Sequence, residues 1–202
     1  MANGQVITGF SKPVVALYSA TGTTVSYTGL MPLARGVDVS LDIETNDDND
    51  FYADNVVAES AGNTFSSGTV TLTVDGLKAE ARKLIMGLPE PTSVSLGGGG
   101  NTVDVYDYDD RQAKPYVGVG FIVRYMEDGV TSYVPYVLPK TIFNDLGIEA
   151  ETQEESIDFQ TTELEATIMR DDSDNHRWQR VGANQTTEAL AYSVLQALLG
   201  GQ

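Results

Sequence analysis

The chain has 202 residues, which is long enough for a single domain with a buried core. It carries 29 acidic and 12 basic residues, and its net charge of −17 disfavours binding to nucleic-acid phosphates or to anionic membranes. It contains no cysteine, which excludes disulfides, thiolate catalysis and cysteine-ligated metals and is typical of a reducing cytoplasm.

Residues 37–44 alternate apolar and polar side chains, which predicts a half-buried strand with an acidic outer face. The acidic run TNDDND follows at 45–50. This run does not fit a calcium-binding EF-hand loop. Counting from Asn46, the positions that require glycine and glutamate hold Phe51 and Val57.

A second alternating strand is predicted at 69–74, with threonines on its polar face. A helix is predicted at 77–86, with Asp75 placed to cap its start and Gly87 to end it. The sequence PEPTSVSLGGGGN at 89–101 then predicts a flexible, Gly-rich insertion.

Two further strands are predicted in the second half of the chain. Residues 117–125 alternate, and a turn at 127–129 joins them to 131–138, a hairpin partner rich in tyrosine and valine. Pro135 and Pro139 place this partner at the edge of a sheet, because proline cannot donate a hydrogen bond to the ladder.

The last predicted strand covers 155–169, and its apolar face changes parity near 160–163, which indicates a β-bulge. An acidic turn follows at 170–175. A second amphipathic helix is then predicted at 187–199, with Gly200 as its stop.

Together these elements predict a mainly β fold, a β-sandwich or partial barrel with one flanking helix and a C-terminal helix. We expect a sandwich domain at 1–182, which contains a long hairpin arm at about 37–60 and the flexible insertion at 89–101. Residues 183–202 are expected to form a C-terminal helical extension.

The sequence holds no recognisable catalytic motif. His176 is the only histidine, and no G-x-S-x-G elbow accompanies it. The segment LGGGGN at 96–101 lacks the lysine that a phosphate-binding loop requires. We therefore predict no catalytic residue, no metal site and no cofactor, and we expect that the protein is not an enzyme.

Negative charge is concentrated in two stretches that contain no basic residue. Residues 36–65 and residues 141–169 each hold eight carboxylates. The simplest interpretation is a solvated acidic face. The alternative is that the protein needs negative charge on one surface.

Three stretches in order resemble the major tail (tail tube) protein of long, non-contractile-tailed bacteriophages of Gram-positive hosts. They are FYADNVVAESAGNTFSSGTVTLTVDGLKAEARKLIMGL, KPYVGVGFIVRYMEDGVTSYVPYVLPKTIF and ESIDFQTTELEATIMRDDSDNHRW. The resemblance covers most of residues 14–181. It does not extend to the tetraglycine segment or to the helix after Gly182.

This resemblance implies a virion structural protein whose copies form hexameric rings, and the rings stack into a tube through which DNA passes. A lumen lined with carboxylates would repel the DNA phosphates, and the strand at 37–44 offers such a face. The implied lumen residues are Asp38, Asp42 and Glu44.

The strands at 37–44 and 51–59 flank the acidic run, so we predict that this run is the tip of a hairpin arm. By the resemblance, the arm reaches a neighbouring subunit or the next ring. The implied arm residues are Asn46, Asp47, Asp48, Asn49, Asp50, Phe51 and Tyr52.

The resemblance also implies partners and a location. The expected partners are other copies of the chain and the tape-measure, distal tail and tail terminator proteins, with DNA passing through without specific binding. The implied location is the virion tail, with assembly in the cytoplasm of the host bacterium. The first ten residues lack the features of a secretory signal and no apolar run approaches the roughly 20 residues that span a bilayer, so we expect no export by a signal peptide and no membrane insertion.

Other interpretations remain open. The chain could be a tail terminator, or the tube protein of a phage-derived bacteriocin or injection device. An acidic carbohydrate- or calcium-binding β-sandwich module is a further alternative. It predicts an aromatic platform or a complete ligand set, and the sequence offers neither.

Overall fold

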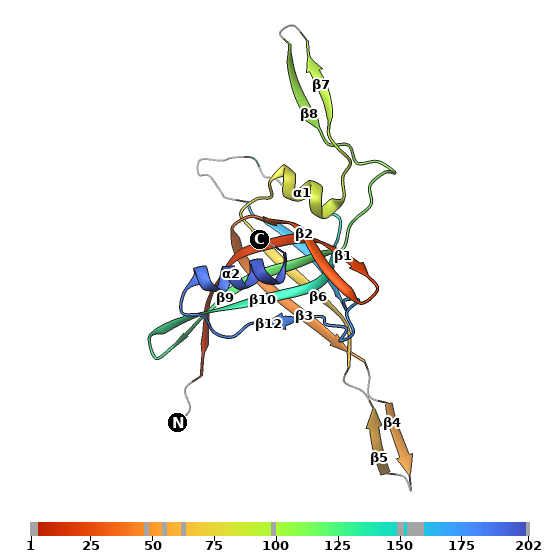
Figure 1. Ribbon diagram of the computed structural model, residues 1–202, viewed down its shortest axis with the longest axis vertical. Helices are drawn as coiled ribbons and strands as arrows, with labels where there is room; N and C mark the ends of the chain where they lie inside the picture. The colour runs from red at the N-terminus through yellow and green to blue at the C-terminus, as the bar shows by residue number, and fades with distance from the viewer. Residues whose placement is uncertain are drawn as a thin grey trace.

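The computed structural model describes residues 4–46, 49–53, 56–61, 64–97, 100–148, 152 and 160–200, with backbone alone for 49–53 and 56–61. The described chain is mainly β, as predicted, with one helix in its middle and one near its C-terminal end (Figure 1). The elements are β1 (Val6–Thr21), β2 (Thr24–Pro32), β3 (Gly36–Thr45), β4 (Asn49–Ala53), β5 (Val56–Ala61), β6 (Phe65–Val74), α1 (Ala79–Met86), β7 (Thr92–Leu96), β8 (Asn101–Val105), β9 (Val117–Glu127), β10 (Val130–Phe143), β11 (Thr162–Met169), β12 (Arg180–Val181) and α2 (Glu188–Leu198).

One antiparallel sheet forms the body, in the order β2-β1-β9-β10-β11-β6-β3, with the short β12 paired to β10. The sheet curls so that β3, at one edge, lies beside β1 without a ladder between them. At Gly36 the two strands approach so closely that an added Cβ would overlap the ring of Phe10. The result is a partial barrel with an open seam between β1 and β3.

The inner face of this curled sheet holds the larger hydrophobic core. Alternate residues along the strands of the large sheet point into this core. The helix α1 covers part of it and packs Ala81, Ile85 and Met86 against the strand side chains. The largest fully buried strand side chains in this core are Leu72, Phe121, Leu138, Phe143, Leu164 and Ile168.

A second core lies on the outer face of β1, β9 and β10, where α2 packs. Ala191, Leu195 and Leu199 from the helical segment are fully buried there. The helix can approach because β9 has glycines on that face. A Cβ at Gly118 or Gly120 would come within 3 Å of a Leu199 methyl group.

The predicted strands at 37–44, 69–74 and 117–125 are confirmed as parts of β3, β6 and β9. The first two strands, β1 and β2, have no counterpart in the sequence analysis. In β1 the residues Val14, Val15 and Ala16 are all buried, because one face meets α2 and the other meets the inner core. A strand buried on both faces lacks the alternation that identifies strands in a sequence.

The prediction that 131–138 lies at a sheet edge is wrong. These residues belong to β10 and pair with β9 on one side. On the other side Tyr136 and Val137 pair with β12, and Tyr133 forms a bridge with Gln185. The prolines are tolerated because the ladder to β11 begins only at Lys140, and Pro139 falls within a register shift against β9. The carbonyl of Pro135 still accepts a hydrogen bond from the Gly182 amide at 2.8 Å.

Both predicted helices are confirmed, but Asp75 does not cap α1. The residue at the start of α1 is Lys78, which makes no capping hydrogen bond through its side chain. The Asp75 carboxylate instead accepts hydrogen bonds from the backbone and guanidinium of Arg35. Gly87 ends the helix with a φ of 61°, as its position in the sequence predicts, and Thr187 caps α2.

Two hairpins project from the body in opposite directions along the long axis (Figure 1). One is β4–β5, which continues the β3–β6 hairpin outward. The strand at 37–44 therefore pairs with β6 and not with 51–59, so the acidic run lies at the junction of β3 and β4 and the prediction that it forms the arm's tip is wrong. The other hairpin, β7–β8, occupies the segment in which we expected a flexible insertion.

The predicted strand at 155–169 is confirmed from Thr162 onward as β11, with Leu164, Ala166 and Ile168 facing the core. The residues at 153–159 lie outside the described part of the chain. Residues 160–163, where a bulge is predicted, are described. The strand begins at Thr162, and its register against β6 is continuous from Thr162 to Ile168, so the bulge is not confirmed.

Tyr136 makes the stability of this fold depend on pH in the alkaline range. Its ring stacks on Phe121 and its hydroxyl lies 2.8 Å from that of Tyr125. Burial, and next the hydrogen bond with Tyr125, raise the pKa of Tyr136 from 10.0 to about 12. A raised pKa in the folded state means that the stabilisation is complete below pH 10 and is lost as the pH rises towards 12.

We therefore expect the variant Tyr136→Phe to lose less of its free energy of unfolding than the wild type between pH 9 and 12, about the interval in which tyrosine ionises. Urea denaturation at several pH values measures the difference. Tyr108→Phe is the control, since Tyr108 is 56% exposed. Parallel curves for Tyr136→Phe and the wild type would contradict the assignment.

Candidate functional site

The outward side chains of β3, β6 and β11 form a continuous polar surface, which we call the acidic face. Register places Asp38, Thr73 and Glu163 in one row across the three strands. The next rows are Ser40, Thr71 and Glu165, and then Asp42, Thr69 and Thr167, while Glu44 pairs with Ser67 beyond them.

The five carboxylates of the acidic face are all exposed. Glu44 accepts a hydrogen bond from the Ser67 hydroxyl at 2.6 Å, and Glu165 accepts one from the Asn144 side chain at 2.7 Å. Within the described residues none of the five forms an ion pair. No lysine, arginine or histidine occurs in β3, β6 or β11, so the face has a single sign of charge.

The hydroxyl residues of β6 separate the charges. Like charges directly opposite each other on neighbouring strands destabilise a sheet. Here every carboxylate of β3 or β11 that pairs with β6 lies opposite a serine or threonine. The carboxylates of β3 and β11 are therefore two strand spacings apart, roughly 10 Å, which is about one Debye length at physiological ionic strength.

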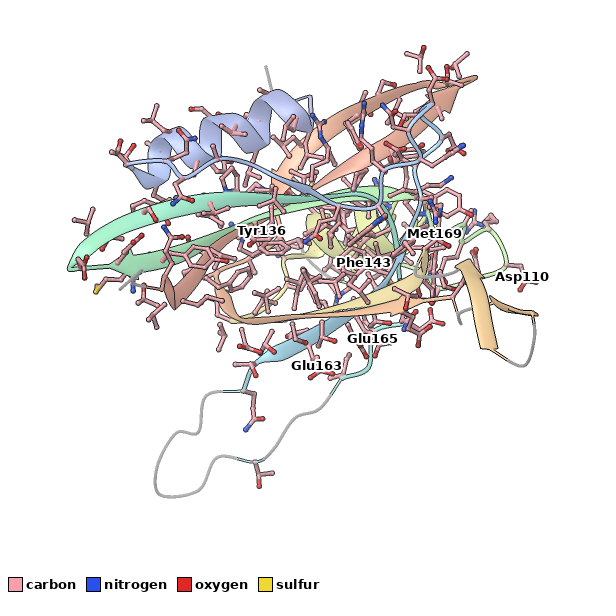
Figure 2. The ribbon with its side chains drawn as sticks, turned by 90° about the horizontal axis from the view of Figure 1, so that it is seen from below. Asp110, Tyr136, Phe143, Glu163, Glu165 and Met169 are labelled. Carbon is pink, nitrogen blue, oxygen red and sulfur yellow. The ribbon has the colours of Figure 1, made fainter. Side chains whose placement is uncertain are left out.

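The acidic face points away from both cores. Figure 2 shows Glu163 and Glu165 on the side of β11 opposite to Phe143 and Tyr136, which lie between the layers. The helix α2 covers the other outer face, over β1, β9 and β10. One outer face of the curled sheet is thus apolar and covered by a helix, whereas the other is polar and acidic.

The structure places the three predicted lumen residues together on this face. Asp38, Asp42 and Glu44 share the outer side of β3. The sequence analysis did not connect Glu163 and Glu165 with them. Their parity, opposite to that of the buried Leu164, shows that they point outward, but only the sheet order shows that β11 lies one strand away from β3.

The predicted arm residues are divided between two environments. Asn46 lies at the base of the arm, where its backbone amide and its side chain donate to Thr64. The backbone of Asn49 to Tyr52 belongs to β4 and pairs with β5. Asp47 and Asp48 lie outside the described residues.

The turn after β11 is held by its own polar groups. The Asp171 carboxylate accepts hydrogen bonds from the hydroxyl of Ser173 at 2.5 Å and from the Arg177 amide at 2.8 Å. Nδ1 of His176 lies 3.3 Å from the Asp171 carbonyl oxygen. The Ser173 hydroxyl therefore donates to a carboxylate and not to the imidazole, so these residues do not form a nucleophile–base pair.

Asp172, in the same turn, ties it to the sheet. The hydrogen bond from the Lys140 ammonium, and then that from the Tyr18 hydroxyl, hold the pKa of Asp172 below its ordinary value. Both contacts measure 2.7 Å. The turn is therefore a structural anchor for the sheet.

A surface groove of about 850 Å³ lies between β1, the start of β3 and α2. Its charged lining is mixed. Lys12, Arg35 and Lys78 line it together with Asp75 and Glu188. Arg35 is paired with Asp75, and Glu188 accepts a hydrogen bond from Ser11 at 2.5 Å. Arg35, Asp75 and Glu188 therefore already have partners, and the Lys12 ammonium lies 5.6 Å from the centre of the Tyr192 ring.

In the described part of the chain, no group of three or more histidine or acidic side chains is placed to hold a metal ion. No helix there is both long enough and apolar enough to cross a bilayer.

Comparisons with known proteins identify no relative of this chain. No protein-family model matches the chain, and no curated protein sequence matches it. The acidic face and the arrangement of the hairpins are the features of the molecule that bear on its function.

Proposed function

We propose that this protein is a virion structural protein, the tail tube subunit of a long-tailed, non-contractile bacteriophage, whose copies form rings that stack around passing DNA. The observation that supports the proposal best is the acidic face. It offers a broad sheet surface, left open by the described residues, with carboxylates spaced by hydroxyls and no basic side chain in its three strands.

Such a surface is suited to a channel for DNA. A duplex carries one negative charge per roughly 1.7 Å of its axis, so contact with it depends on neutralising the phosphates. Carboxylates provide no such neutralisation, and they repel the phosphates at separations within the Debye length. DNA would pass an acidic lumen without adhering, while the hydroxyl groups keep the wall hydrated.

The arrangement of the remaining surfaces supports assembly. Hairpins project at opposite ends of the body, and the strands β2 and β3 have a free edge each. Projecting hairpins and free strand edges are the features that bind neighbouring chains. In this proposal the protein is not an enzyme, and its partners are other copies together with the tape-measure, distal tail and terminator proteins.

Negative-stain electron microscopy of the purified protein tests the proposal directly. We expect six-fold rings or tubes of uniform bore, and more of them as salt is raised, because salt screens the repulsion between copies that each carry 17 net negative charges. A protein that stays monomeric at high concentration and high salt, also when purified phage tail-tip complexes are added as a template, would contradict it.

A further inference from the structure

The β7–β8 hairpin has an apolar face that its own chain leaves uncovered. Register places Val94 opposite Val103, Thr92 opposite Val105 and Leu96 opposite Asn101, so these side chains share one face. Its four apolar members are between 39% and 54% exposed; they are Val94, Leu96, Val103 and Val105. We call this surface the arm face.

The opposite side of the hairpin is polar. It carries Ser93, Ser95, Thr102 and Asp104, and the Ser93 hydroxyl donates to the Asp104 carboxylate at 2.6 Å. The hairpin points away from the body (Figure 1), so the body does not cover the arm face. A two-stranded hairpin that stands alone in water is marginally stable, and exposed apolar surface of this kind marks a contact site.

Charge favours another copy of this chain as the partner. Across residues 92–105 the only charged side chain is Asp104, although the chain as a whole has a net charge of −17. Two such acidic chains repel each other over most of their surfaces. They approach at least cost where one of them presents an uncharged surface, and the arm face is such a surface.

The chain also offers a matching receptor, the open seam between β1 and β3. The segment of β1 up to Ser11 pairs only with β9, and β3 pairs only with β6. Between the two strands lies a groove of about 300 Å³. Its lining includes Ile7, Phe10, Val37, Asp38, Val39 and Tyr125.

The rim of this seam is exposed and is apolar except for Asp38, where the seam borders the acidic face. Ile7 is 63% and Val37 is 55% accessible to solvent, whereas Phe121 at the floor belongs to the inner core. The N-terminal end of β1 lies towards the end of the molecule opposite to β7–β8 (Figure 1). The arm face and the seam are thus two different apolar surfaces at different places on one chain.

We infer that the arm face of one copy covers the seam between β1 and β3 of a second copy. The contact buries the four apolar arm residues and closes the opening to the inner core. Because it joins two different surfaces, the contact is heterologous. It can therefore repeat from copy to copy and does not end at a two-fold dimer. The inference rests on the proposed function, for which it names one contact between copies.

Two matched double variants test the contact. Val94→Asp with Val103→Asp places two carboxylates on the arm face, and Ser95→Asp with Thr102→Asp places them at the neighbouring cross-strand pair on the polar side. We expect the first to weaken self-association by roughly 100-fold or more, since an unpaired carboxylate buried against apolar groups is costly. The second should associate like the wild type, as measured by sedimentation velocity.

Disulfide trapping locates the contact, because the chain has no cysteine of its own. Val94→Cys or Val103→Cys is mixed with Ile7→Cys or Val37→Cys and oxidised, and the products are resolved by mass. A disulfide requires Cβ atoms within about 4.5 Å. We expect linked pairs between an arm position and a seam position, and at most traces when Ser95→Cys replaces the arm cysteine.

The outcomes separate this contact from the proposed function. If the variant Val94→Asp with Val103→Asp forms tubes as well as the wild type does, the inferred contact is wrong, whereas the proposed tube function is supported. Equal loss in both double variants, or arm-to-arm disulfides as the main product, would also overturn it. Specific arm-to-seam disulfides without rings or tubes under any condition would support the contact and count against the tube.

Discussion

Replacing Asp38, Asp42 and Glu163 by lysine is expected to turn a tube that lets DNA pass into one that retains it. These three carboxylates lie on the acidic face, and no hydrogen bond or ion pair within the described structure involves their side chains. Their exchange should therefore leave the fold intact. In the proposed tube every copy would then present three cations to the lumen, and each cation–phosphate contact releases counterions.

DNase protection distinguishes DNA inside the lumen from DNA on the outside. Assembled particles are incubated with a short DNA duplex and then treated with DNase, and the amount of undigested DNA is measured. We expect protected DNA only in the lysine variant, falling steeply between about 50 and 200 mM salt as phosphate contacts are lost. The wild type should protect almost none.

The control moves the same charge to other surfaces. Glu80, Asp110 and Asp174 are exposed residues outside the acidic face, and their exchange for lysine changes the net charge by the same amount. Figure 2 shows Asp110 in a loop away from Glu163 and Glu165. If the two variants protect equal amounts of DNA, DNA retention depends on the total charge and not on the position of the lysines. The assignment of the acidic face to the lumen would then be wrong.

Leu195→Ala is expected to cause the largest loss of stability among alanine substitutions in α2. Leu195 is fully buried between the helix and the outer face of the sheet, and its methyl groups lie against Gly120. Truncation of a buried leucine removes its transfer energy and leaves a cavity, which together cost about 2–5 kcal/mol. Urea denaturation followed by circular dichroism measures the change in the free energy of unfolding.

Leu190→Ala is the matched control, because Leu190 belongs to the same helix but is 50% exposed. It should change the free energy of unfolding by less than about 1 kcal/mol, as is usual for surface positions. Similar losses for both variants would show that helix propensity and not docking on the sheet determines their effect.

The sequence was informative where one side of an element faces water. Alternation identified β3, β6 and the part of β11 that the structure describes, and it separated the buried Leu164 from the exposed Glu163. The apolar stripe at 187–199 likewise predicted an amphipathic helix, and α2 packs on the sheet through this stripe. These patterns depend on local contrast between apolar and polar neighbours.

Other features depend on tertiary contacts and could not be inferred in this way. The order of strands in the sheet brings β11 to β6 across a long connection, so the acidic face as a unit appears only in three dimensions. β1 is buried on both sides and has no alternation. In β7–β8 the four consecutive glycines obscured a hairpin whose alternation of valines with serine and threonine is visible once the pairing is known.

The placement of the arm face and the seam has a consequence for any polymer that grows through them. The arm face of β7–β8 and the seam lie towards opposite ends of the body (Figure 1), so copies joined by the inferred contact would all point the same way. One end of the polymer then presents unoccupied arms, and the other presents unoccupied seams. Such a polymer has polarity, so one kind of protein can start it and a chemically different one can stop it, without any change within the subunit itself.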